Sequence, residues 1–236
     1  MEILMYSCLA GLSTLLGAII ILISNPEHPL YLAILLGFAA GVMLAVVFFE
    51  LIPSALTLGL LHEIILAIPV GGLIIGIISM VLHKSLPATG SEQDLIRIGY
   101  LITAGIALHN LPEGLAIGTG MAVSPELSSL IALSLGVHNI PEGMAAAGPL
   151  RAGKMSWIST LCLITMAGLV TPVGTLAGML FINIFPELVG ISLNIAAGAM
   201  LYLIIEELLP KARSYHAPST NIGFFIGVIT GMLLIN

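Results

Sequence analysis

Two short stretches place histidine, asparagine and glutamate inside otherwise apolar sequence. The first is ALHNLPEGLAIG at 107–118, and GVHNIPEGMAAAG at 136–148 repeats its order. In each, a histidine stands four residues before a glutamate, a spacing that puts both side chains on one face of a helix. Imidazole, carboxylate and amide oxygen form a mixed nitrogen–oxygen ligand set suited to a borderline divalent ion such as zinc or iron. The pattern therefore predicts a metal site.

The candidate ligands are His109, Asn110, Glu113, His138, Asn139 and Glu142. Ionisable groups at mid-bilayer are costly, and two facing carboxylates that neutralise a dication would remove most of that cost. A single buried His–Glu pair can also be a structural hydrogen bond, but its duplication favours a metal site. Glu50 is a further carboxylate within an apolar run, for which a helix-end role stays open.

The composition indicates that lipid is the main solvent of this chain. Hydrophobic residues make up 58% and charged residues 8% of the 236 positions, with a mean hydropathy of +1.17. A soluble domain carries about a quarter charged residues. Without a basic stripe, nucleic-acid binding is excluded. Cys8 and Cys162 match no metal or disulfide spacing and are expected to be small packed residues.

Continuous apolar runs, rather than alternating ones, predict membrane-spanning helices of roughly 20 residues each. Breaks at polar and proline-containing clusters give eight spans, approximately 3–23, 31–58, 64–82, 95–123, 127–149, 155–181, 188–209 and 219–235. The first is expected to be a retained span rather than a signal peptide, because only Glu2 and no basic residue precedes it. The fold class is an all-α polytopic membrane protein whose longest connection is 83–94.

The basic residues predict the orientation. They are Lys84, Arg97, Arg151, Lys154, Lys211 and Arg213. With eight spans, all six lie beside the 3–4, 5–6 and 7–8 connections, which share one side of the membrane. The opposite side carries Glu2, Glu63, Glu126 and Glu187. By the positive-inside rule, both termini are then extracytoplasmic, in a protein of the cytoplasmic (inner) membrane.

An internal repeat relates the two ends of the chain. AAGVMLAVVFFELIP at 39–53 and AAGAMLYLIIEELLP at 196–210 share eight of fifteen positions at an offset of 157, which also pairs GLSTLLG at 11–17 with GLVTPVG at 168–174. Helices 1 and 2 thus resemble helices 6 and 7, which run in the opposite direction. The chain is predicted to be one transporter domain, 1–236, with helices 1–3 and 6–8 as inverted repeats around helices 4 and 5 (3+2+3).

Proline and glycine follow the same duplication. Pro112 and Pro141 lack the amide proton of an ordinary helical residue, so each is expected to kink its helix. Gly114 and Gly143 follow the two glutamates. They are expected to let helices 4 and 5 approach closely.

These residues resemble the ZIP (Zrt-, Irt-like protein) family of divalent-metal transporters, of the prokaryotic type. The resemblance rests on HNLPEG, HNIPEG, GVM…ELIP and GAM…EELLP, and it spans the whole chain. It implies metal binding between helices 2, 4, 5 and 6, import toward the cytoplasm, and a homodimer. One implied site uses His109, Glu113, His138 and Glu142, with Met43 as a neighbour. A second implied site shares the two glutamates and adds Asn110 and Asn139, and Glu50 lies along the same pathway.

The sequence departs from the family at one position. Family members commonly carry a glutamate before the proline of helix 6, where GLVTPVG has Thr171. A hydroxyl is a weak, neutral ligand, so the second site is expected to be weaker or absent. Connection 83–94 also lacks the His-rich tract of many members. A methionine such as Met43 is more often a packing residue than a ligand, and this alternative stays open.

The predicted function is transport of a divalent metal ion, with zinc first and iron, manganese, cobalt and cadmium as further candidates. The ion is cargo, so no cofactor and no enzyme activity are expected. An intramembrane metalloenzyme would need an H-E-x-x-H helix or similar, which the sequence lacks. A proton- or sodium-coupled carrier of a small organic solute is the remaining alternative. It would need a roomier cavity with aromatic contacts, and only 6% of the residues are aromatic.

Overall fold

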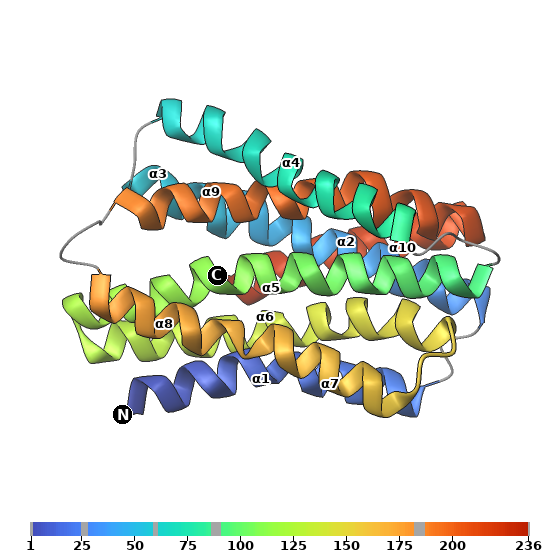
Figure 1. The fold of residues 1–236 in the computed structure, drawn as a ribbon, viewed down its shortest axis with the longest axis horizontal. Coiled ribbons are helices and arrows are strands. Elements are labelled where there is room, and N and C mark those ends of the chain that lie inside the picture. The colour runs from blue at the N-terminus through green and yellow to red at the C-terminus, as the bar shows by residue number, and fades with distance from the viewer. Residues whose placement is uncertain (1, 25–27, 59–60, 86–90, 182–186, 236) are drawn as a thin grey trace.

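The computed structural model describes residues 2–24, 28–58, 61–85, 91–181 and 187–235, and every element within them is helical. Figure 1 shows these helices lying side by side along one long axis, joined by short connections. Helices satisfy their backbone hydrogen bonds internally, which an apolar solvent requires. The all-α prediction is therefore confirmed.

The helices are α1 (Glu2–Ile23), α2 (Pro29–Val46), α3 (Ile52–Leu58), α4 (Leu61–Ser85), α5 (Ser91–Val123), α6 (Pro125–Ala152), α7 (Trp157–Gly168), α8 (Val170–Phe181), α9 (Glu187–Tyr202) and α10 (Leu209–Ile235). Two π-helical turns, η1 (Val47–Leu51) and η2 (Leu203–Leu208), join α2 to α3 and α9 to α10. Shifting η1 by 157 positions places it on η2. Such widened turns are rare and are frequently found at functional sites.

Five helical stretches within the described residues are long and apolar enough to cross a membrane. They are Glu2–Ile23, Pro29–Thr57, Leu66–Ser85, Trp157–Leu180 and Gly190–Ile235. Helices α5 and α6 are not among them, although both are longer than 25 residues. Their apolar character is diluted by the two polar motifs, which lie near the middle of the helical bundle.

Two predicted spans differ from the observed helices. The span at 155–181 is divided at Leu169 into α7 and α8. Leu169 lies three residues before Pro172, which cannot donate to the carbonyl of Gly168. The span predicted to end at 209 continues into α10, which bends at His216, where the backbone is extended (φ −165°, ψ 102°). The backbone N–H of Ser219 donates to His216 Nδ1 at 3.3 Å, which caps the second part of α10.

The tightest helix contacts involve glycine, but not as the sequence suggested. A Cβ added at Gly143 would overlap the carbonyl oxygen of Thr14 in α1, and one at Gly114 would overlap that of Thr171 in α8. The prediction that these glycines join α5 to α6 is therefore wrong. Their close approach attaches each motif helix to an outer helix. The two threonines are 157 positions apart, so the contacts are counterparts.

The helix pairs show the same correspondence. Contacts are most extensive between α2 and α10, α1 and α6, α5 and α8, α5 and α6, and α4 and α9. A shift of 157 positions places α1 on the segment made of α7 and α8, and places α2 on α9. The contact of α1 with α6 therefore corresponds to the contact of α8 with α5. In the same way, the contact of α2 with α10 corresponds to the contact of α9 with α4. The main apolar core lies among these helices and includes Met43 and Met200, both at most 1% exposed.

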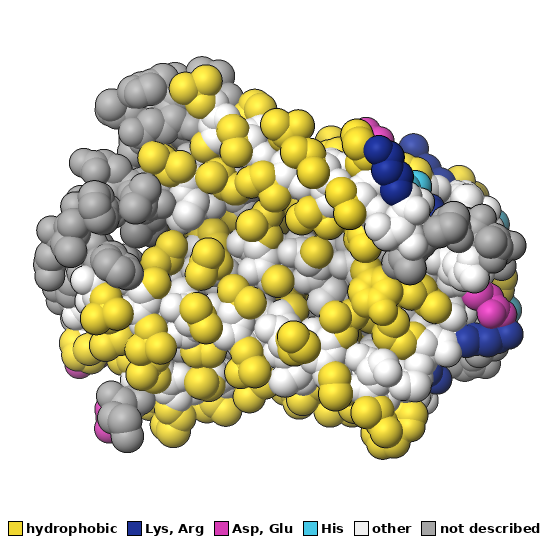
Figure 2. Space-filling view, in the orientation of Figure 1, with side chains coloured by type: hydrophobic (Ala, Val, Ile, Leu, Met, Phe, Trp, Pro, Cys, Tyr) yellow, Lys and Arg dark blue, Asp and Glu magenta, His cyan; other side chains and the backbone are white. Residues whose placement is uncertain are grey.

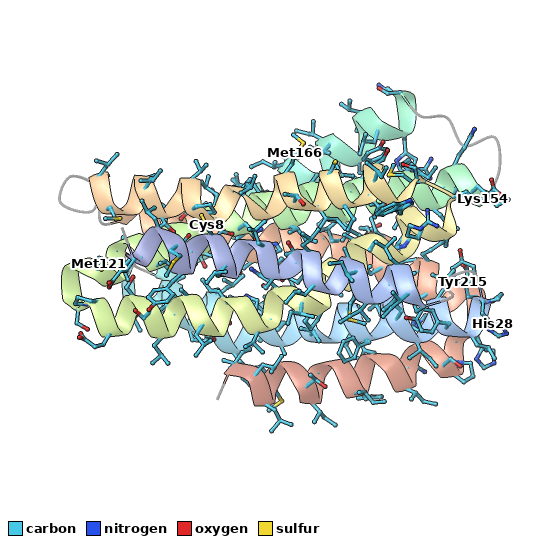
Figure 3. The ribbon with its side chains drawn as sticks, turned by 90° about the horizontal axis from the view of Figure 1, so that it is seen from below. Cys8, His28, Met121, Lys154, Met166 and Tyr215 are labelled. Atoms are coloured by element: carbon cyan, nitrogen blue, oxygen red, sulfur yellow. The ribbon has the colours of Figure 1, made fainter. Side chains whose placement is uncertain are left out.

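Apolar side chains cover most of the face shown in Figure 2, and the Lys and Arg side chains visible there gather at one end. Figure 3 places Lys154, Tyr215 and His28 at one end of the bundle and Met121 toward the other. Cys162 is exposed and Cys8 half-buried, so the packing expected for Cys162 is wrong. The side chains of Glu63 and Glu187, and residues 86–90 of the predicted long connection, lie outside the described residues.

Candidate metal centre

The two motifs lie on neighbouring helices, the first on α5 and the second on α6. Both helices continue through their motif prolines, Pro112 and Pro141. All six motif side chains are buried, each at most 1% exposed: His109, Asn110, Glu113, His138, Asn139 and Glu142. The interior of the helical bundle thus holds a polar cluster whose side chains are almost fully shielded from solvent.

Each histidine pairs with the glutamate of the other helix. His109 Nε2 lies 2.8 Å from Glu142 Oε2, and His138 Nε2 lies 3.2 Å from Glu113 Oε1. The sequence spacing fixes only the face that a histidine and a glutamate share, and it does not identify the partner of either side chain. The structure joins α5 and α6 by two crosswise contacts, so the motifs form one cluster.

A third carboxylate reaches the cluster from η1. Glu50 Oε2 lies 3.6 Å from His138 Nδ1, and the Glu50 side chain is 23% exposed. His138 therefore stands between two carboxylates, whereas His109 contacts one among the described residues. Glu50 provides the more exposed side of the cluster.

The two asparagines tie the motif helices to the outer helices. Asn110 Nδ2 donates to the carbonyl oxygen of Ala167 at 3.0 Å, and Asn139 Nδ2 donates to that of Ala10 at 2.9 Å. The two acceptors are 157 positions apart. These contacts orient both amides so that the nitrogen faces a backbone carbonyl and the oxygen stays free for another partner.

Every motif side chain keeps one buried polar atom without a hydrogen-bond partner among the described residues. These atoms are His109 Nδ1, Asn110 Oδ1, Glu113 Oε2, His138 Nδ1, Asn139 Oδ1 and Glu142 Oε1. Buried polar atoms are normally paired in folded proteins. Six unpaired nitrogen and oxygen atoms on two facing motifs fit a cation ligand, and their mixed character suits a borderline divalent metal.

The side chains form pairs rather than a finished cage. In the described part of the chain, no three His, Cys, Asp or Glu side chains are close enough together to hold a metal ion. Met43 lies in the apolar core, which agrees with its alternative as a packing residue. Thr171 is fully buried with its Oγ1 unpaired among the described residues.

Three features of the centre were not predicted: the crosswise pairing, the carbonyl acceptors Ala10 and Ala167, and the contact of Glu50 with His138. The repeat could have indicated the second, because the two alanines stand at equivalent positions. The third depends on the widened turn η1, and no residue pattern in the sequence identifies such a turn. The repeat also makes Glu207 in η2 the counterpart of Glu50.

Comparison with known proteins decides the family. The family model of the ZIP zinc transporters matches residues 82–236, well over half of the chain. The chain belongs to the ZIP family. Several curated relatives agree along nearly their whole length, and each is named zinc transporter ZupT. As a ZIP protein the chain is a metal transporter and not an enzyme, which confirms the predictions of family and of enzyme class.

Three of these ZIP relatives illustrate the match. The relative from Chlorobium chlorochromatii is 36% identical over 95% of this chain and 91% of its own length. That from Corynebacterium aurimucosum is 38% identical over 87% and 84%, and that from Enterobacter sp. is 35% identical over 97% and 92%. The similarity therefore covers both motif helices and both ends of the chain.

Proposed function

We propose that this ZIP protein carries zinc toward the cytoplasm, through the cluster formed by the two motifs of α5 and α6. The observation that carries the proposal is the pair of buried His–Glu contacts that cross between these helices. Zinc comes first because the relatives are named zinc transporters. Iron, manganese, cobalt and cadmium are the other candidate ions, because the same ligand types accept them.

The chemistry of the cluster supports a dication as cargo. Glu113 and Glu142 supply two negative charges in a setting where an isolated charge is costly. The imidazoles supply nitrogen ligands of intermediate softness, and Asn110 and Asn139 supply neutral oxygens. An ion that enters would take over the carboxylate oxygens that now face the histidines, so the separate pairs would draw together around it.

Glu50 is proposed to hand the ion to the cluster. Its carboxylate contacts His138 and is the most exposed of the three acidic groups there. A partly hydrated dication would meet this carboxylate first and lose water on moving inward. Met43 is proposed only as a neighbour of the pathway, on the basis of the family resemblance.

We further propose one domain of eight spans, in which the first three and the last three spans are inverted repeats of each other around α5 and α6. Three pairs of matched features support this arrangement. They are the helix contacts of Gly114 and Gly143, the carbonyl acceptors of the two asparagines, and the positions of η1 and η2. Inverted repeats commonly serve alternating access around a site at mid-membrane. Here the outer helices would move against the central pair.

The orientation and assembly are proposed on separate grounds. The gathering of Lys and Arg at one end of the bundle (Figure 2) supports placing that end in the cytoplasm, with both termini outside and the protein in the inner membrane. A homodimer is proposed from the family resemblance. The organic-solute alternative is not favoured, because the family transports metals and the polar cluster is almost fully buried.

Zinc flux into proteoliposomes tests the function. A zinc-sensitive dye trapped inside should respond to external zinc with the full chain and not with Glu113→Ala or Glu142→Ala. Glu126→Gln is the matched control. Glu126 is exposed in the first turn of α6, and the substitution removes one carboxylate from the same helix that carries Glu142. Equal flux for wild type and both alanine variants would contradict the proposal. Zinc accumulation by cells expressing the chain tests the direction, and net loss of cellular zinc would contradict import.

A further inference from the structure

An apolar groove lies where α2, α6 and α10 meet, away from the metal cluster. Its volume is about 260 Å³. Ile34 of α2 and Ile226 of α10 line it and are 42% and 51% exposed, whereas Leu35 of α2 also lines it and is 5% exposed. The α6 side is formed by Met144, which is half-buried. The groove therefore has an exposed rim and reaches into the bundle.

The groove follows from the way in which the three helices approach one another. The backbones of α2 and α10 touch, because a Cβ added at Gly223 would lie 2.2 Å from the carbonyl oxygen of Ile34. Helix α6 meets α2 through a side chain instead, since a Cβ added at Gly148 would lie 2.6 Å from Leu35 Cδ2. The seam between α6 and the tightly packed pair of α2 and α10 is thus wider than the seam within that pair.

The chemistry of the lining selects a hydrocarbon. Among the described residues that line the groove, only Tyr31 has a polar side-chain group, and its hydroxyl donates to Ser24 Oγ at 3.1 Å. A polar ligand would find no free side-chain partner on this lining, and an unpaired polar group is costly in an apolar setting. An apolar chain incurs no such cost.

The size of the groove separates an acyl chain from a partner helix. Its residues on α2 lie within 31–38, which covers about 10 Å of helix axis. A helix about 10–12 Å across fills at least roughly 800 Å³ over that length, about three times the groove volume. The same length fits within the about 15 Å of hydrocarbon that one leaflet provides. Part of one acyl chain matches both measures.

We propose that this groove binds an acyl chain of a membrane phospholipid. Its exposed rim is continuous with the apolar surface that a ZIP transporter presents to the bilayer, so acyl chains are the hydrocarbon that reaches it. Tyr31 lies three residues after His28, which Figure 3 places at the same end of the bundle as Lys154. With the orientation proposed above, the chain belongs to the cytoplasmic leaflet. Binding of the chain does not depend on the proposed cargo.

The position of the groove gives the bound chain a mechanical role. It lies between α6, one of the two central helices, and the outer helices α2 and α10. Under the motion proposed above, these parts move against each other. A gap without atoms forfeits dispersion contacts, whereas a flexible acyl chain can keep the seam packed while its walls shift.

Photolabelling of the full chain in vesicles tests the site. The vesicles contain phosphatidylethanolamine and phosphatidylglycerol, with a diazirine on an acyl chain of the phosphatidylglycerol, and labelled residues are identified by peptide mass spectrometry. Met144 should be labelled in the wild type and should lose most of its label in Ile226→Trp, because the indole fills the groove from its rim. Ile229→Trp is the matched control and should keep the label. Ile229 is the same residue type on the same helix, is 59% exposed and does not line the groove.

Either an unlabelled Met144 in the wild type or equal labelling of Met144 in the two tryptophan variants would overturn the proposal. If Ile226→Trp aggregates, Ile34→Trp fills the groove from the opposite rim and should give the same loss. Native mass spectrometry of the detergent-purified chain then separates a bound lipid from a passing one. The wild type and Ile229→Trp should retain phospholipid that Ile226→Trp lacks, and retention of detergent alone by the wild type would overturn the proposal.

Zinc flux in the dye assay tests the mechanical role. Ile226→Trp should carry zinc more slowly than Ile229→Trp, because a fixed indole cannot follow the moving walls of the seam. Equal flux in the two variants would overturn this role. A wild type that carries no zinc would overturn the proposed function, whereas the labelling of Met144 would still decide the lipid site.

Discussion

The two halves of the metal cluster differ at one point. In both, a histidine faces the glutamate of the opposite helix and an asparagine holds an outer helix. Glu50 in η1, however, contacts His138. Its counterpart Glu207 in η2 accepts a hydrogen bond from Ser79 Oγ at 3.0 Å. The matched part of the structure supplies the proposed ligands, and the unmatched part distinguishes one side of the cluster from the other.

This difference bears on how an inverted-repeat carrier would work. Alternating access requires the two halves to exchange roles around a fixed site. Glu50 reaches the cluster while Glu207 is held by α4, so the proposed motion would release one carboxylate and engage the other. The following variants separate the shared ligands from the unshared carboxylate, in order of decreasing effect.

Removing the shared carboxylates should have the largest effect. The double variant Glu113→Ala and Glu142→Ala leaves no buried negative charge on either motif, and zinc flux should fall by about 100-fold or more. The dye assay in proteoliposomes measures it, with insertion checked by the recovered protein. Flux at the wild-type rate would show that the cluster does not lie on the pathway.

Removing either histidine should be the next most severe change. His109→Ala and His138→Ala each delete one proposed nitrogen ligand. Zinc affinity should fall in both by similar factors, each at least the about 10- to 100-fold that losing an outer partner of a ligand costs. Isothermal titration calorimetry with Zn²⁺ measures both. If one variant binds like the wild type while the other loses all binding, the two halves do not share one ion.

The two carboxylates of the π-helical turns should differ in their effect on zinc binding. Glu50→Gln should weaken zinc binding by about tenfold, because Glu50 acts beside His138 as an outer partner. Glu207→Gln should change it by less than about twofold, because Glu207 bonds to Ser79. The same titration tests both, and a larger loss in Glu207→Gln would reverse the assignment of the two sides.

Removing either asparagine contact should have the smallest effect, and the two variants should lose similar amounts of stability. Asn110→Ala and Asn139→Ala each remove one hydrogen bond between helices, and each should lower the free energy of unfolding by about 0.6–1.7 kcal/mol. Thermal unfolding of the metal-free chain in detergent measures the loss. Clearly unequal losses would contradict the equivalence of the Ala167 and Ala10 contacts.

The sequence identified which polar side chains share one face of each motif helix, because four-residue spacing fixes that face whatever the helix contacts. It could not predict that His109 would meet Glu142, since the partner depends on how α5 and α6 are rotated against each other. The glycine prediction failed for the same reason. Gly114 and Gly143 show where helices approach closely, but not which helix approaches.

Local backbone departures were equally hard to predict. The turn η1 inserts an extra residue into a helical turn, and Glu50 reaches His138 from that turn. The bend at His216 lies two residues before Pro218, which cannot donate a backbone hydrogen bond to the carbonyl of Ser214. The sequence suggested a broad break at 210–218, whereas the structure narrows it to one extended residue that caps the next helical segment.

The central claim is that the two motifs bind one and the same ion. Zinc-edge X-ray absorption on the zinc-loaded full chain tests it most directly by counting imidazole ligands. We expect two imidazoles with oxygen ligands in the wild type, and one imidazole in either His109→Ala or His138→Ala. A spectrum that is unchanged in one of these variants would contradict a site shared between α5 and α6.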